Sequence, residues 1–182
     1  MRRLAVVLVL VLAACGGGGS DAERAPSSVA LSLVPSTVNG GAFRLAEDEQ
    51  AREAFATVGP QALVADGRLF VIRDGERLVG TLQLSTMKTK VDLTDDDQRQ
   101  SVISNVIPGA KETISVGPVS VVQSAGADKT VFLWFGREMF QVLQLKPTQA
   151  SPFEPERILS EIITHQTGQD AWDPLPRPDD DD

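Results

Sequence analysis

The sequence has very few of the residues that usually carry nucleophilic, metal-binding or proton-transfer chemistry. Its 182 residues include one Cys, one His and no Tyr. A catalytic or metal-binding His normally has partners of a similar type, and the chain contains neither an HExxH spacing nor a GxSxG motif. We therefore expect no enzyme activity, no cofactor and no metal site. The single His, His165, is expected to be structural.

Basic clusters and long apolar runs are also missing. The formal charge is -8 and the 17 Lys and Arg residues are scattered, which argues against a nucleic-acid partner. The longest apolar run near the N-terminus, Leu4 to Ala14, has 11 residues. A membrane-spanning helix needs about 20, so this run is expected to be the apolar region of a secretion signal, with Arg2 and Arg3 as its positive start.

The end of this run carries a specific motif, Leu12-Ala13-Ala14-Cys15 followed by Gly16. It resembles the lipobox of bacterial lipoproteins. The resemblance implies that residues 1–14 are a signal peptide and that Cys15 is lipidated and becomes the first residue of the mature chain. It also implies anchoring at the extracytoplasmic face of a bacterial cell membrane. The alternative is a chance cysteine after an ordinary signal peptide, or a plain N-terminal anchor.

Composition divides the remaining chain into three parts. Residues 15–41 begin GGGGSDAERAPSS after the Cys and are predicted to be a flexible tether, although Val29 to Val38 is apolar enough to dock as an edge strand. Residues 42–168 are predicted to form one domain, which has no Cys for a disulfide and must depend on its apolar core. Residues 169–182 hold three Pro and six Asp and are predicted to be a disordered acidic tail.

Hydrophobic periodicity predicts an α+β domain, with an antiparallel sheet of about 5–7 strands packed by helices. Thr94 or Asp95 is placed to cap the second helix, and Pro155 suits the first turn of the last one. The expected helices are Ala46 to Val58, Asp95 to Ile107 and Glu154 to Gln166. The expected strands are Leu69 to Arg73, Arg77 to Ser85, Glu112 to Val116, Val119 to Ser124, Thr130 to Phe135 and Glu138 to Leu145.

Two of the expected hairpins have similar sequences. Asp74-Gly75 predicts a type I′ turn within Arg68 to Leu84, and this segment resembles Thr130 to Leu145. Each hairpin is followed by an amphipathic helix. We expect two hairpin-helix units side by side, and the alternative is that any two amphipathic hairpins look alike.

Two of the expected strands have apolar residues on both faces, at Leu69 to Ile72 and at Thr130 to Phe135. A strand of a sheet with one face in water should instead alternate between apolar and polar residues. The second apolar face of these two strands must therefore be covered by another part of the protein or by a partner. The residues of that face are Phe70, Ile72, Phe132 and Trp134. The cover is expected to be the first helix with Phe55, the docked segment Val29 to Val38, or Trp172.

Alternatively, these four residues line a surface for a ligand or partner. The sequence therefore predicts a non-enzymatic binding or interaction module, with a membrane and an envelope protein or apolar ligand as its partners. The alternative is a carrier or sensor of an apolar small molecule or lipid held between sheet and helices. A closed cavity next to Trp134 would favour the carrier.

Overall fold

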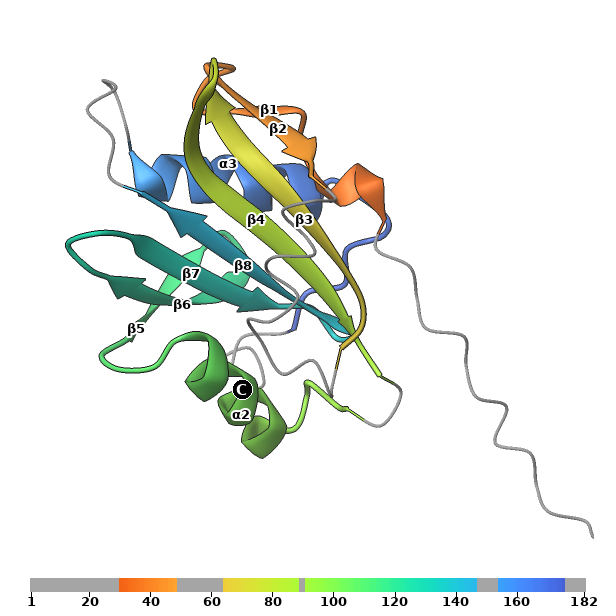
Figure 1. Ribbon diagram of the computed structural model, residues 1–182. Coiled ribbons are helices and arrows are strands. Elements are labelled where there is room, and N and C mark those ends of the chain that lie inside the picture. Colours follow the sequence, from red (N-terminus) through yellow and green to blue (C-terminus); the bar gives the residue numbers. More distant parts are fainter. Residues whose placement is uncertain (1–29, 49–63, 89–90, 147–153, 176–182) are drawn as a thin grey trace, which may run out of the picture.

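The computed structural model describes residues 30–48, 64–88, 91–146 and 154–175. They form an eight-stranded antiparallel sheet with two helices, α2 (Asp96–Val106) and α3 (Pro155–Thr167) (Figure 1). The predicted α+β class is confirmed, and the sheet has more strands than the 5–7 expected. The signal peptide, Cys15 and residues 49–58 of the first predicted helix lie outside the described residues.

The strands follow the order β1-β2-β3-β4-β8-β7-β6-β5 across the sheet. Neighbours in this order pair antiparallel, and β1 and β5 are the two edges. The strands are β1 (Thr37–Val38), β2 (Phe43–Glu47), β3 (Val64–Asp74), β4 (Arg77–Met87), β5 (Glu112–Val116), β6 (Val119–Ala125), β7 (Thr130–Phe135) and β8 (Met139–Leu145).

The predicted hairpin at Asp74-Gly75 is present, with a different turn. Gly75 and Glu76 form the two-residue loop between β3 and β4, and of these only Gly75 has a positive φ, 59°. A positive φ at the first central position alone is typical of a type II′ turn, so the type I′ prediction is wrong. The period of two along Arg77 to Ser85 predicts Leu78 on the same buried face as Leu82, but a register shift beyond this turn exposes Leu78 (41%) and buries Val79 (1%) instead.

The N-terminal part of the domain begins earlier than the sequence predicted. A 3₁₀ turn at Leu31–Leu33 and the edge strand β1 precede β2, and Leu33 and Val38 are fully buried. Residues from 30 onward therefore belong to the domain and not to a tether that extends to residue 41. The helix predicted from Ala46 is also wrong at its start, because Ala46 and Glu47 pair with β3 as part of β2.

The start of the predicted tail is also part of the fold. Pro174 forms a β-bridge with Gly136, and Arg137 N–H donates to the carbonyl of Asp173 at 3.0 Å. Trp172 is buried in the same apolar cluster as Trp134. Residues 169–175 are therefore ordered against the end of the β7-β8 hairpin, contrary to the prediction of a disordered tail from residue 169.

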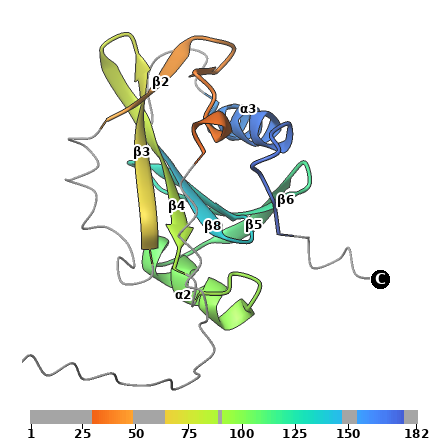
Figure 2. The ribbon, with the colours of Figure 1, turned by 90° about the vertical axis from the view of Figure 1, so that its right-hand side faces the viewer.

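The two helices cover opposite faces of the sheet (Figure 2). Ile158, Leu159, Ile162 and Ile163 of α3 share a cluster with one face, and Val102 and Ile103 of α2 share a cluster with the other. Strands in the middle of such a sandwich must be apolar on both sides. This explains why β7 carries Phe132 and Trp134 on the α3 face and Leu133 on the α2 face.

Local signals place both helices where the sequence predicted them. The Asp95 carboxylate accepts a hydrogen bond from the backbone N–H of Gln98 at 2.9 Å and so caps α2. Pro155 occupies the first turn of α3. Each helix follows a hairpin, and each is held to the sheet by its apolar stripe.

Candidate functional site

The four residues singled out from the sequence lie together on one face but form no exposed surface. Phe70, Ile72, Phe132 and Trp134 belong to one cluster, and all four are buried. Their cover is α3, with Leu33 and Val38 from the N-terminal segment and Trp172 from the C-terminal one. The last helix occupies the space over these residues that a partner would need, and Phe132 also borders a pocket, which is described below. Phe55 lies outside the described residues.

A buried polar network closes the core beside Trp134. Its indole Nε1–H donates to Gln166 Oε1 at 3.1 Å, and Gln166 Nε2–H donates to Gln141 Oε1 at 2.7 Å and to the carbonyl of Leu33 at 3.1 Å. All of these side chains are fully buried. Trp134 is thus sealed between sheet and helix, and it does not line the pocket described next.

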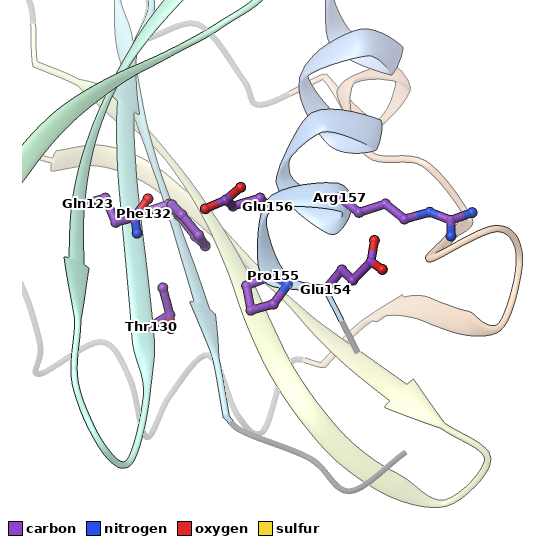
Figure 3. Close-up of a pocket in the computed structure, with 7 residues that line it drawn as sticks. All are labelled: Gln123, Thr130, Phe132, Glu154, Pro155, Glu156 and Arg157. Carbon is purple, nitrogen blue, oxygen red and sulfur yellow. The ribbon is translucent and has the colours of Figure 1, made fainter. Parts of the chain in front are cut away.

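That pocket lies on the same face, between the first turn of α3 and strands β6 and β7 (Figure 3). We call it the α3 pocket. Its volume is about 630 Å³, within the range of small-molecule sites. Its lining is mixed, with apolar, uncharged polar and charged side chains. The lining residues are Gln123, Thr130, Phe132, Glu154, Pro155, Glu156 and Arg157.

Strand register places the floor of the α3 pocket. Gln123 of β6 stands directly opposite Phe132 of β7, so the two side chains share a face. Along β6, Val119 and Val121 occupy the same face and belong to the core. Gln123 is the next residue of β6 on this face. It is not part of the apolar cluster and lies near the first turn of α3.

Gln123 is the unusual group of this site. Its side chain is only 8% exposed, and its carbonyl oxygen Oε1 is buried without a hydrogen-bond partner among the described residues. A buried acceptor without a donor costs about 1–3 kcal/mol. Such groups are uncommon in folded proteins, and a bound ligand or water that donates to the oxygen removes the penalty.

The charged residues around the pocket point in different directions. Glu156 extends from α3 toward Gln123 and Phe132, whereas Arg157 points away from them (Figure 3). Arg157 Nε–H donates to Glu161 Oε1 at 3.0 Å, so its charge is already paired. The Glu161 carboxylate also accepts from the backbone N–H of Gly40, at 3.0 Å and 3.2 Å.

A further carboxylate stands next to Gln123 in the sheet. Glu112 of the edge strand β5 is the direct register partner of Gln123 and is exposed. Residues opposite each other in an antiparallel pair project on the same side. Glu112 therefore lies on the α3 face of the sheet, on the outer side of Gln123.

Other sequence features have structural explanations. His165 Nε2 lies 2.8 Å from the carbonyl of Ser32, which fastens α3 to the N-terminal segment. The Asp92 carboxylate accepts from both the hydroxyl and the backbone N–H of Thr94, and these hydrogen bonds hold the pKa of Asp92 below its usual range. Within the described ranges, no His, Cys, Asp and Glu residues gather into a group of three that could hold a metal ion, and no helix has the length and hydropathy to cross a membrane.

Sequence reasoning did not single out Gln123 or Glu156. The spacing of Gln123 does indicate its position, because it comes two residues after Val121, as Val121 comes two residues after Val119. A polar residue therefore stands where the alternation predicts a side chain on the buried face. No signal was available for Glu156, because its place beside β6 depends on where α3 lands on the sheet. Comparisons with protein-family models, with curated proteins and with solved structures found no match to this chain.

Proposed function

We propose that this chain is a lipid-anchored binding protein at the extracytoplasmic face of a bacterial cell membrane. Cys15 of the Leu12-Ala13-Ala14-Cys15 motif carries the lipid, and two or more acyl chains give stable anchoring. The domain that follows is a non-enzymatic binding module. Its ligand enters the α3 pocket.

One observation carries the binding proposal. The side chain of Gln123 lines a pocket of about 630 Å³, and its oxygen Oε1 is buried without a hydrogen-bond donor among the described residues. A donor group on a bound molecule would remove the penalty of this unpaired oxygen and gain affinity from it. Core packing alone does not require a Gln at this position.

The lining favours binding over catalysis. Among the described residues of the α3 pocket, Thr130 is the only hydroxyl, and no His, Lys or Cys lies beside it to activate it. The lining also argues against an apolar cargo, because charged and amide side chains make up much of the wall. Of the aromatic residues expected to hold such a cargo, Phe70 and Trp134 are buried away from this pocket, and Phe132 is fully buried at its floor.

Membrane fractionation tests the anchor. Wild-type protein is expected in the membrane fraction, and Cys15→Ser, which has no thiol to accept the lipid, is expected to be unlipidated and to have weaker membrane retention. Globomycin, which blocks removal of the signal peptide and not lipid transfer, is expected to leave the signal peptide attached to the lipidated chain. Ser27→Ala, in the same N-terminal stretch, is the matched control. Identical fractionation and mass for Cys15→Ser and wild type would overturn the lipoprotein assignment.

Native mass spectrometry tests the binding site. Protein extracted gently from its own membranes is expected to carry a bound small molecule, and Gln123→Leu is expected to lose it. Gln144→Leu is the control. Gln144 of β8 pairs with Val131 of β7, and Val131 belongs to the apolar cluster on the α2 face, so Gln144 lies on the face opposite to the α3 pocket. A bound mass that survives Gln123→Leu would exclude the α3 pocket as its site.

We also propose that the two similar hairpins form an internal repeat. Phe70 pairs with Leu82 as Phe132 pairs with Leu143, and Leu82 pairs with Leu143 where the hairpins meet. These pairings agree with an alignment of the two segments that sets Phe70 over Phe132 and Leu82 over Leu143. The repeat does not extend to the helices, since α2 and α3 cover opposite faces.

A further inference from the structure

The α3 pocket is lined by a side chain whose hydrogen-bond acceptor has no donor among the described residues. Gln123 Oε1 is this acceptor, and the Gln123 side chain is more than nine-tenths buried. The Glu156 carboxylate is directed toward the same space (Figure 3). An oxygen of an amide and an oxygen of a carboxylate both require an N–H or O–H group from the ligand.

Carboxylates lie around this acceptor, and none of them has an ion-pair partner in the part of the chain that the structure describes. Glu156 and Glu154 line the pocket, and Glu112 stands beside Gln123 on β5. Among the ion pairs of the described residues, none includes these three carboxylates. Among the described lining residues the cation is Arg157, and it is paired with Glu161.

The N-terminus of α3 does not make the pocket favour an anion. The N-terminus of a helix by itself favours an anion. In α3, however, Pro155 has no N–H to offer, and Glu156 already places a negative charge in the first turn. Pro155 and Glu156 therefore weaken the preference of this helix end for an anion.

Phe132 and Pro155 supply the apolar part of the wall. Phe132 lies opposite Gln123 in the sheet and is fully buried at the floor of the pocket, so a group that donates to Gln123 Oε1 lies above this apolar floor. A flat apolar portion joined to a nitrogen donor fits both features.

We infer that the α3 pocket recognises a cationic nitrogen, a primary ammonium or a guanidinium, attached to a small apolar group. The nitrogen donates to Gln123 Oε1 and is neutralised by Glu156, with Glu112 and Glu154 adding to the negative field. This inference rests on the proposed binding function of the pocket and names the ligand class for it.

Three matched probes test this ligand class on the full chain purified from membranes in detergent. Benzylamine is cationic, benzyl alcohol is neutral, and benzoate is anionic. We expect calorimetry to detect benzylamine binding, with much weaker binding of the other two. The dissociation constant for benzylamine should rise as salt is added, because screening weakens the attraction of the carboxylates.

Variants locate the interaction. Gln123→Leu is expected to weaken benzylamine binding about tenfold or more, since it removes a hydrogen bond to a charged group. Glu156→Gln is expected to weaken it about fivefold, the scale of a solvent-accessible ion pair. Glu76→Gln, the same charge change in the β3-β4 turn, is the control and is expected to leave binding unchanged.

The outcomes separate this inference from the proposed function. If benzyl alcohol or benzoate binds as tightly as benzylamine and Gln123→Leu removes that binding, the pocket function stands and cation recognition is overturned. If benzylamine binds and neither Gln123→Leu nor Glu156→Gln weakens its binding, the claim that the α3 pocket recognises the cation is overturned. If no probe binds and the extracted protein carries no bound mass, both proposals fail.

Discussion

Trp134 donates its indole N–H to the side-chain carbonyl of Gln166, 3.1 Å away, inside an otherwise apolar core. Gln141 Nε2–H donates to the same oxygen at 3.1 Å, and Gln166 Nε2–H reaches the carbonyl of Leu33. One side chain of α3 thereby joins β7, β8 and the N-terminal segment. Because buried polar groups cost free energy unless paired, this network fixes how α3 lies on the sheet.

Gln166→Leu is expected to lower the free energy of unfolding by about 3 kcal/mol, because it leaves the Trp134 N–H and the Gln141 amide buried without their partner. Urea unfolding followed by tryptophan fluorescence measures the loss. Gln100→Leu, on the exposed side of α2, is the matched control and should change stability by less than about 0.5 kcal/mol. Equal midpoints for the two variants would contradict a structural role for the network.

Gly80→Ala is expected to destabilise the fold by about 1–3 kcal/mol through overpacking. A Cβ at this position would press against the backbone oxygen of Gln144 and lie 2.7 Å from Leu145 Cδ2. Gly67→Ala is the control in the same hairpin, since the nearest atoms to its added Cβ are 3.7 Å away. Thermal unfolding of both variants should show a large shift for Gly80→Ala only.

Trp172→Ala is expected to cost about 3 kcal/mol or more, because it empties the space that this buried ring fills beside α3. Trp172→Phe should be much milder. The Trp172 Nε1–H is buried and has no hydrogen-bond partner among the described residues, so replacing the indole by a phenyl ring also removes an unpaired donor. Chemical unfolding of the two variants distinguishes them. Similar, small effects would show that the 169–175 segment does not stabilise the domain.

Thr94→Val is expected to raise the pKa of Asp92 toward its usual range, because the Thr94 hydroxyl bond is the main cause of its lowered value. The Asp92 pKa is lower in the folded state than in the unfolded one. Its contribution to stability is therefore present above the unfolded pKa and lost as the pH falls through the folded pKa. NMR titration of the Asp92 carboxyl in both proteins measures the shift. An unchanged pKa in Thr94→Val would assign the effect to the backbone bond instead.

Most elements with a strong local signal could be predicted from the sequence. The Asp95 cap, Pro155 and the Gly75 turn each act within a few residues, and the elements they delimit were placed within a few residues of their ends. The N-terminal elements were predicted only in part, because Val29 to Val38 was expected to dock as an edge strand and Thr37–Val38 forms one, whereas β2 was expected to begin a helix. Ala46 and Glu47 fit a helical pattern, and only the free edge of β3 draws them into a strand.

The candidate site was less predictable than the fold. Alternation along β3 and β7 correctly placed Phe70, Ile72, Phe132 and Trp134 on one face, but periodicity does not say which element covers a face. The last helix covers it, and the remaining open space lies beyond Phe132, at Gln123 and Glu156. These two residues meet only because strand register and the docking of α3 bring them together.

The sequence by itself determined the α+β class, the hairpins, both described helices and the shortage of catalytic side chains, because each depends on composition or on contacts between near neighbours. The tertiary structure decided which face each helix covers, that the segments at both ends of the domain pack into the core, and that a buried glutamine oxygen is left without a donor beside a carboxylate. These properties depend on the packing of distant segments. That packing is selected by the free energy of burying apolar surface, which depends on the area that is buried and not on which segment of the chain buries it. The order of residues in one segment therefore does not say which distant segment will cover it.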